Sequence, residues 1–253
     1  MPDDQAKEKS DLLTMFGVDV ERVQPVSIVN ANHYVNLARS FADEHDGCVF
    51  TDQFENLSNY KAHYTTTGPE IWRQTSGKVD AFVMGSGTGG TIAGVSTFLK
   101  ERRPGVKVFL VDPQGSSLYN HVKHGVCYAD EQAEARLKRH RYDTIVEGIG
   151  IDRVTRNYGK ASVDDAFRVT DQEAVYMARW LLRHEGLFVG SSSATNCVGV
   201  VKAARSLPPG STIVTLLCDG GSRHLTRFWN PEFLQGRGLT AELPPDGGLG
   251  FVA

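Results

Sequence analysis

The sequence predicts an α/β protein built on parallel sheets with flanking helices. Three observations carry this prediction. Short apolar runs recur along the chain, most of them are followed by segments with helical spacing, and three of them end in loops rich in glycine or serine. Strands that alternate with helices in this way form parallel sheets, because the helix supplies the crossover connection.

The first fifty residues read as a helix, a strand, a second helix and a second strand. Residues 5–16 mix charged and apolar side chains at helical spacing and stop at Gly17, which is typical of an amphipathic helix. Residues 18–23 alternate like a half-exposed strand, a helix starts near Asn32, and residues 47–50 read as the next strand. A parallel sheet needs further strands to cover it, so we expect an N-terminal piece to be missing.

The central part of the chain carries clear strand and helix signals. Pro69 suits the first turn of a helix, whereas the charged stretch that follows Gly115 has no strand pattern. The predicted segments here are helices at residues 59–66, 91–101 and 131–139 and buried strands at residues 79–84 and 106–111.

Two helices and one strand are expected towards the C-terminus. Thr170 and Glu173 have the spacing of a capping box, which predicts a helix over residues 174–184. A serine-rich turn opens a helix that runs to Val201, and residues 212–217 form a strongly apolar strand. The Gly- and Pro-rich tail from residue 236 is predicted to be loose.

Composition narrows the possible partners to small molecules. The chain has 253 residues, is 40% hydrophobic and 23% charged, and carries a net charge of −3, so no basic surface for nucleic acid is expected. No run approaches the roughly 20 apolar residues that span a bilayer. The acidic first residues do not resemble a targeting peptide, so the chain as written is predicted to be cytoplasmic.

The four cysteines give no sign of a disulfide framework or a zinc site. They lie far apart and never form a Cys-x-x-Cys pair. We therefore expect reduced thiols at Cys48, Cys127, Cys197 and Cys218.

A glycine-rich loop between a strand and a helix is the strongest candidate for a binding site. Glycines let the backbone approach an anion closely, and the N-terminus of the following helix offers unpaired N–H groups, so the loop suits a phosphate. A plain tight turn is the alternative. The loop residues are Gly87, Thr88, Gly89, Gly90 and Thr91.

Two further loops follow strands and are expected to meet this one, since ligands in open α/β sheets bind outside the carboxyl ends of the strands. They begin after Val189 and after Leu217. Gln53 also follows a predicted strand and could bind a carboxylate, although a solvated loop glutamine fits its position equally well. Asp112 and Asp219 end strands and could be acids in a site or could only cap turns.

Other side chains give weaker signals. His121 and His124 could meet on one helix face, but no third ligand has a matching spacing, so no metal site is predicted. The serines Ser191, Ser192 and Ser193 lack the Gly-x-Ser-x-Gly elbow of a nucleophile, and helix capping or phosphate contact fits them better.

Several motifs follow one another along the chain. They are Asn56-Leu57-Ser58-Asn59, Thr66-Thr67-Gly68-Pro69-Glu70-Ile71-Trp72, the glycine loop, Val111-Asp112-Pro113, Gly148-Ile149-Gly150, Glu185-Gly186-Leu187-Phe188-Val189-Gly190-Ser191-Ser192 and Cys218-Asp219-Gly220. In their order they resemble the motifs of the cysteine synthases of the tryptophan-synthase-β-like superfamily, which are fold type II enzymes dependent on pyridoxal 5'-phosphate (PLP). The resemblance covers about residues 1–234 and is strongest, through Cys218-Asp219-Gly220-Gly221-Ser222-Arg223-His224-Leu225, to a fungal branch that has some mitochondrion-associated members.

The resemblance implies a PLP-dependent replacement in which an activated serine, such as O-acetylserine, reacts with sulfide to give cysteine. Residues Gly87 to Thr91 would carry the cofactor phosphate and Gln53 would meet the substrate carboxylate. The family usually places a serine at the pyridine nitrogen, where this chain has Gly220 beside Asp219. The resemblance also implies a homodimer. It further implies that the chain has three parts: a remnant of the small N-terminal domain (1–47), the large PLP-phosphate-binding domain (48–234) and the loose tail (235–253).

One departure from the family affects catalysis. The Schiff-base lysine of the family lies in a Ser-x-Lys-Asp-Arg type motif that this sequence lacks. We therefore assign no catalytic residue and expect PLP to bind non-covalently if it binds. An N-terminally truncated enzyme, whose missing part could carry a mitochondrial targeting segment, is the first hypothesis; a non-catalytic module that binds PLP or phosphate, and an unstable fragment, are the alternatives.

Overall fold

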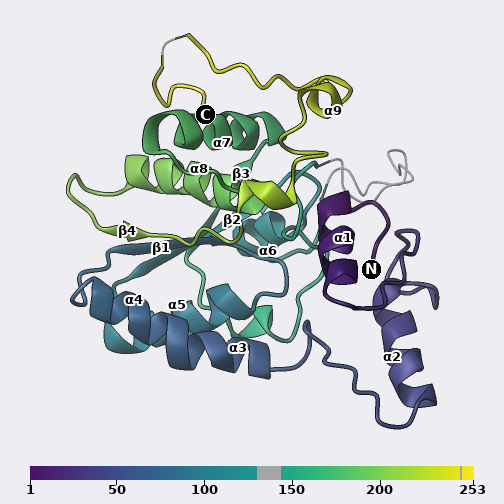
Figure 1. The fold of residues 1–253 in the computed structure, drawn as a ribbon. Coiled ribbons are helices and arrows are strands. Elements are labelled where there is room, and N and C mark those ends of the chain that lie inside the picture. The colour runs from purple at the N-terminus through teal and green to yellow at the C-terminus, as the bar shows by residue number, and fades with distance from the viewer. Residues whose placement is uncertain (130–143, 246) are drawn as a thin grey trace.

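The computed structural model describes residues 1–129, 144–245 and 247–253, and it confirms the α/β fold. At its centre lies a sheet of parallel strands in the order β3-β2-β1-β4 (Figure 1). The strands are β1 (Ala81–Gly85), β2 (Lys107–Pro113), β3 (Asp165–Val169) and β4 (Ile213–Val214).

Helices cover both faces of this sheet and make three layers (Figure 1). They are α3 (Ser58–Ala62), α4 (Gly68–Gln74), α5 (Gly90–Arg102), α6 (Leu118–His124), α7 (Asp171–Glu185), α8 (Ser191–Ser206) and α9 (Pro231–Gln235). Successive strand residues point to opposite faces, so that Ala81 and Val83 pack with α7, α8 and α9, whereas Phe82 and Met84 pack with α4, α5 and α6.

Most of the predicted helices are present. The capping box of α7 is complete, because Thr170 accepts from the Glu173 N–H and the Glu173 carboxylate accepts from the Thr170 N–H. Pro69 lies in the first turn of α4, as its fixed φ favours. The predicted helix at residues 59–66 divides into α3 and a π-helical turn, η1 (His63–Thr67). The predicted helix at residues 131–139 lies outside the described residues.

Several strand predictions were wrong. Residues 18–23 form only an isolated bridge between Val23 and Pro2, and Val49 of the expected strand at 47–50 is 82% exposed. An alternating pattern becomes a strand only where another strand pairs with it, and no described strand lies beside these segments. The strand expected at 212–217 shortens to β4, and β3 was not predicted because its polar Asp165 and Arg168 weaken the apolar signal.

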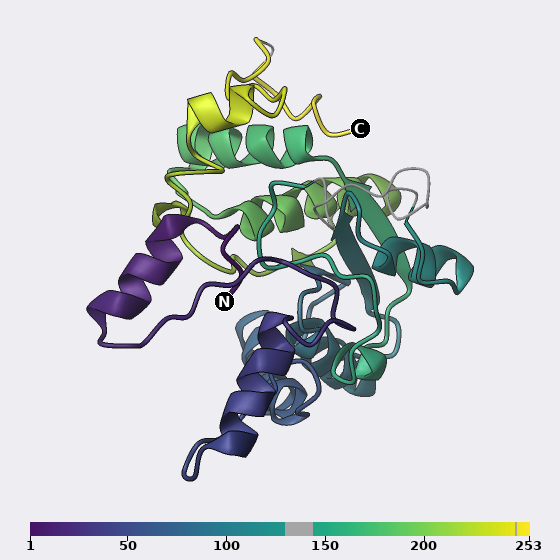
Figure 2. The same cartoon turned by 90° about the vertical axis from the view of Figure 1, so that its right-hand side faces the viewer.

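The N-terminal helices lie to one side of the sheet layers (Figure 2). They are α1 (Lys7–Met15) and α2 (Tyr34–Glu44), the two helices predicted for this segment. The first is held to the loop after β4, because the Glu8 carboxylate accepts from the backbone N–H and the hydroxyl of Thr226.

The C-terminal segment lies along α7 and α8. Arg205 donates to the Val252 carbonyl at 2.7 Å, and the Trp180 ring N–H donates to the Gly247 carbonyl at 3.2 Å. The division into parts at residues 1–47, 48–234 and 235–253 stays a prediction.

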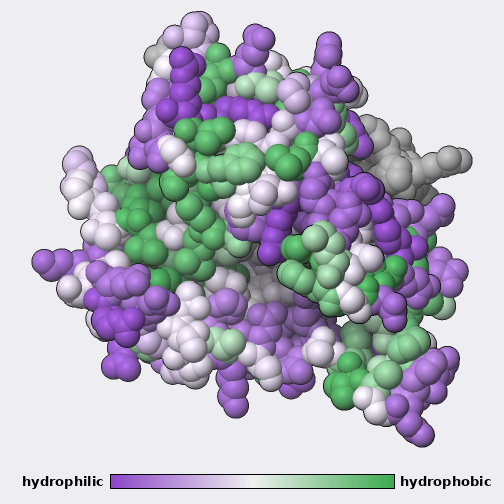
Figure 3. All heavy atoms as spheres, viewed as in Figure 1, coloured by the Kyte–Doolittle hydropathy of each residue, from purple (hydrophilic) through white to green (hydrophobic). Residues whose placement is uncertain are grey.

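Hydrophilic and apolar side chains are mixed over the face seen in Figure 3, with an apolar area on the β4 side of the sheet. Among the described residues, no helix has the length and apolar character that crossing a membrane requires.

Candidate cofactor site

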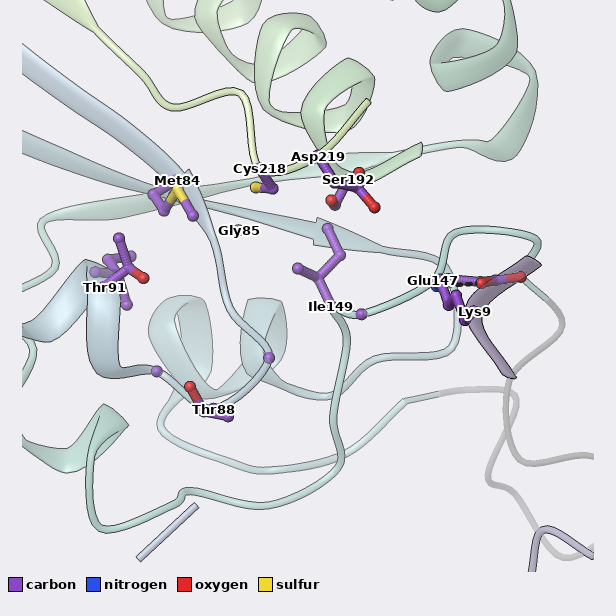
Figure 4. A pocket seen from close by; sticks show the side chains of 14 residues that line it. Lys9, Met84, Gly85, Thr88, Thr91, Glu147, Ile149, Ser192, Cys218 and Asp219 are labelled. Atoms are coloured by element: carbon purple, nitrogen blue, oxygen red, sulfur yellow. Dashed lines mark hydrogen bonds and ion pairs between the residues drawn. The ribbon is translucent and has the colours of Figure 1, made fainter. Parts of the chain in front are cut away.

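A cavity of about 280 Å³ opens beyond the carboxyl ends of the strands, and the three predicted loops meet around it. The loops after Val189 and after Leu217 are hydrogen-bonded to each other, since the Gly190 N–H donates to the Asp219 carbonyl at 2.9 Å. Figure 4 shows the lining side chains. The cavity is lined by Lys9, Met84, Gly85, Gly87, Thr88, Gly89, Thr91, Ile92, Glu147, Gly148, Ile149, Ser192, Cys218 and Asp219.

Backbone geometry builds one end of this cavity. Strand β1 ends at Gly85 and helix α5 begins at Gly90, so the loop between them presents the N-terminus of a 13-residue helix. Gly89 is the N-cap with a φ of 86° and has no side chain to cap the helix, while the Gly90 N–H donates to Thr88 Oγ1 at a long 3.4 Å. A Cβ atom on Gly87 would lie 2.2 Å from the carbonyl oxygen of Gly148, so the two loops can approach only because Gly87 has no side chain.

Two hydroxyl groups complete this end, which we call the glycine-loop end. Thr88 Oγ1 accepts from Asn59 Nδ2 at 2.9 Å, and Thr91 Oγ1 lies 3.1 Å from His63 Nε2. Both threonines line the cavity. The glycine-loop end therefore offers N–H and O–H groups without a charged side chain of its own.

Charged side chains build the opposite end, where Glu147 and Lys9 lie beyond Ile149 in Figure 4. The Glu147 side chain is only 5% exposed and forms ion pairs with Lys9 and with Arg227, whose Nε lies 3.0 Å from Oε1. His224, which is also buried, places Nδ1 3.9 Å from Glu147 and Nε2 2.8 Å from the Asp219 carboxylate. We call these five residues the charged end; they tie α1 to the wall of the cavity.

The cavity brings together some of the predicted site residues. Gly87, Thr88, Gly89, Thr91 and Asp219 all line it. Their part in binding a cofactor stays a prediction.

The other predicted residues lie outside the lining. Gly90 is buried at the start of α5, where a Cβ atom would lie 1.9 Å from Asn59 Oδ1. Gly220 forms an isolated bridge with Val189. Gln53 is exposed, and its carbonyl accepts from Asn59 Nδ2 at 2.9 Å. The Gln53 backbone is thus linked to the glycine-loop end through Asn59, which also donates to Thr88.

Sequence reasoning missed several lining residues. Glu147 precedes the Gly148-Ile149-Gly150 turn, which marked a loop but gave no sign of a buried charge. Lys9 meets it from 138 positions away in the sequence, and no local pattern can reveal such a contact. Cys218 was expected only as a reduced thiol, and it lines the cavity.

The histidine pair and the cysteines show no site of their own. Within the described residues, no group of three His, Cys, Asp or Glu side chains is arranged to hold a metal ion. The four cysteines are free thiols.

Comparison with known proteins identifies the family. The model of the family described as "Pyridoxal-phosphate dependent enzyme" matches residues 1–219, which is most of the chain. The chain belongs to this family. The predicted resemblance to fungal cysteine synthases is also confirmed: cysteine synthase 2 of Schizosaccharomyces pombe is 53% identical over 261 residues, a match that covers 100% of this chain and 66% of that protein.

Two further matches agree with this assignment. A Saccharomyces cerevisiae protein, provisionally named a mitochondrial cysteine synthase, is 50% identical over 238 residues, covering 90% of this chain and 61% of the relative. The solved structure of an O-acetylserine dependent cystathionine beta-synthase from Helicobacter pylori superimposes with a TM-score of 0.75 at 27% identity, covering 90% of this chain and 68% of that one. The fold is therefore that of the fold type II PLP enzymes. The chain spans a little under two thirds of the length of these two cysteine synthases.

The residues present suit the phosphate group of PLP. A phosphate monoester needs several hydrogen-bond donors and no nearby carboxylate, and it gains from the dipole of a helix N-terminus. The glycine-loop end meets these needs with the start of α5, whose N-cap is a glycine, and with the hydroxyls of Thr88 and Thr91. The aldehyde side of PLP has no free amine here, since Lys9, the one lysine among the described lining residues, is paired with Glu147.

Proposed function

We propose that the glycine-loop end binds the phosphate of PLP. The observation that carries this proposal is the N-terminus of α5, where the N-cap Gly89 offers no side chain and two hydroxyls line a cavity shared by three loops. Gly87, Gly89 and Gly90 let the backbone approach the anion, and Thr88 and Thr91 donate to it. The family match supports the proposal, because the matched residues 1–219 include the glycine loop.

We also propose that the whole protein is an enzyme of the cysteine-synthase type, which replaces the leaving group of an activated serine by sulfide. The names of its relatives support this assignment. PLP, when bound, would supply the electron sink for such a replacement. In this proposal Gln53 binds the substrate carboxylate, and Asp219 and Gly220 lie towards the pyridine nitrogen.

The assembly and location of the protein follow from the same assignment. We propose that it forms a homodimer like the intact members of the family. The name of the S. cerevisiae relative supports a mitochondrial location, against the cytoplasmic location expected from the acidic first residues of the sequence.

A second candidate function, non-catalytic binding of PLP, is favoured by the ion pair of Lys9. A lysine acts as a nucleophile only when its amine is neutral, and the Lys9 ammonium is held by a carboxylate that is itself buried. We propose that residues 1–253 alone hold PLP without a covalent bond.

A titration of residues 1–253 with PLP tests the first proposal. We expect saturable binding, followed by absorbance and fluorescence, with inorganic phosphate competing and with pyridoxal, which lacks the phosphate, binding at least tenfold more weakly. Equal affinity for PLP and pyridoxal, or no saturable binding, would overturn a phosphate site at the glycine loop.

Chemical trapping separates the two candidate functions. Borohydride reduction fixes PLP wherever it is bound to a lysine, and mass spectrometry then locates it. We expect no labelled peptide, with Lys9 unmodified, and no cysteine formed from O-acetylserine and sulfide. A single labelled lysine together with cysteine formation would replace the binding-only proposal by a catalytic one.

A further inference from the structure

The glycine-loop end rests on a π-helical turn. Helix η1 (His63–Thr67) continues α3 with wider hydrogen-bonded turns, and π-helical turns often occur at functional sites. It lies directly against α5, since a Cβ atom on Gly94 would be 2.6 Å from the backbone nitrogen of Tyr64 and 2.7 Å from the Cβ of His63. The absence of a side chain at Gly94 thus sets His63 close to the start of α5.

His63 lies between two hydroxyl groups. Its Nε2 is 3.1 Å from Thr91 Oγ1, and its Nδ1 is 3.0 Å from Thr67 Oγ1. Thr91 lines the cavity, whereas Thr67 is half-buried on the far side of the ring. The ring therefore joins a hydroxyl of the cavity wall to a hydroxyl at the end of the π-helical turn.

The protons in this chain of three side chains can be assigned by counting them. A threonine hydroxyl has one proton, so if Thr91 donates it to an anion, its oxygen must accept from His63. This requires a proton on Nε2 and leaves Nδ1 to accept from Thr67. The neutral ring has this one-donor, one-acceptor arrangement, and burial lowers the pKa of His63, which favours the neutral form.

We propose that His63 is a positioning residue that directs the hydroxyl proton of Thr91 towards the phosphate of the ligand. The inference rests on the proposed phosphate site and adds to it the group that orients one of its donors. The other threonine hydroxyls of η1 have a different use: Thr65 and Thr66 donate back to main-chain carbonyls of α3. Only the His63 side chain links this turn to a cavity-lining hydroxyl among the contacts of the described residues.

PLP titrations of residues 1–253 with substitutions at His63 test the inference. We expect His63→Phe to weaken PLP binding about tenfold, the typical cost of a lost donor to a charged acceptor. His63→Gln, whose amide N–H can replace Nε2–H, should restore most of the affinity. Thr66→Val, a matched change in the same turn, should have no effect.

Two readouts distinguish positioning from a merely structural role. Pyridoxal has no phosphate, so its affinity should be the same in all variants. Addition of His63→Phe to Thr91→Val should cause no further loss of PLP affinity, because both changes remove one interaction. Additive losses, or equal losses for PLP and pyridoxal, would overturn the inference. If the unsubstituted chain failed to bind PLP, the proposed phosphate site would fall as well.

Discussion

The two ends of the cavity are built from different chemical groups. The glycine-loop end consists of backbone N–H groups and hydroxyls, within one strand-loop-helix unit and the π-helical turn beside it. The charged end consists of ionisable side chains from three distant segments: Lys9 from α1, Glu147 from the loop after residue 143, and Arg227, His224 and Asp219 from the loop after β4.

This difference predicts different responses to substitution. The glycine-loop end depends on the absence of side chains. Substitutions at this end should mainly change the affinity for a ligand. The charged end places a carboxylate in a buried position, where each partner offsets the cost of removing it from water. Substitutions at the charged end should mainly lower the free energy of unfolding and loosen the attachment of α1.

The largest effect is expected for Glu147→Gln. The substitution keeps the shape of the side chain but removes the charge that pairs with Lys9 and Arg227, which are each about one fifth exposed. Loss of one partner of a buried ion pair costs about 3 kcal/mol. Urea unfolding should show this loss, and hydrogen exchange should show α1 opening first.

The matched control for that experiment is Glu185→Gln, at the exposed end of α7. It should leave the free energy of unfolding within about 0.5 kcal/mol of the unsubstituted chain. Equal stability of the two variants would show that the charged end does not hold α1.

Asp112 sharpens the comparison, because it is a buried carboxylate held by the backbone. It lies at the end of β2, where its Oδ2 accepts from the Tyr119 N–H at 2.7 Å. Burial raises the pKa of Asp112 to about 6, from an ordinary 3.8. The folded chain therefore holds this proton more tightly than the unfolded chain does, so the stability contributed by Asp112 is full below about pH 4 and is lost as the pH rises through about 6.

Asp112→Asn should remove this dependence. Relative to the unsubstituted chain, its free energy of unfolding should rise by about 2–3 kcal/mol between pH 4 and pH 7, since one pKa unit corresponds to about 1.4 kcal/mol. Denaturant curves at several pH values measure the difference. A constant difference over this range would contradict the raised pKa.

Gly87→Ala tests the glycine-loop end directly. The new Cβ atom would lie 2.2 Å from the Gly148 carbonyl, so one of the two loops must move. Overpacking of this kind costs about 2 kcal/mol, and the displaced loop should lose measurable affinity for PLP. Gly105→Ala is the control, because no atom lies within 4 Å of its added Cβ. Normal PLP binding by Gly87→Ala would show that the loop does not contact the phosphate.

The same contrast explains how much could be predicted from the sequence. The fold class, the family and most of the helices follow from local patterns such as the capping box of Thr170 and Glu173. The glycine loop is also local, since a strand, four glycines and a helix are consecutive in the chain. Its residues could therefore be named before the structure was known, and five predicted site residues line one cavity.

The features that could not be predicted from the sequence depend on contacts between distant segments. Lys9 and Glu147 meet across 138 positions, and His63 reaches Thr91 across 28. The strands expected at residues 18–23 and 47–50 fail for a related reason: a strand needs a neighbour, and the pattern within one segment does not say whether a neighbour exists.

The smallest effect is expected for Thr88→Val, which separates the hydroxyls from the backbone at the glycine-loop end. Thr88 Oγ1 accepts from Asn59 Nδ2, so its own proton is available for a ligand. Loss of one such donor should weaken PLP binding about fivefold, with little change in stability, because the residue is only half-buried. Thr88→Ser should restore the affinity. If Thr88→Val bound PLP as the unsubstituted chain does, the phosphate would be held without Thr88, by the backbone and by Thr91 with its partner His63.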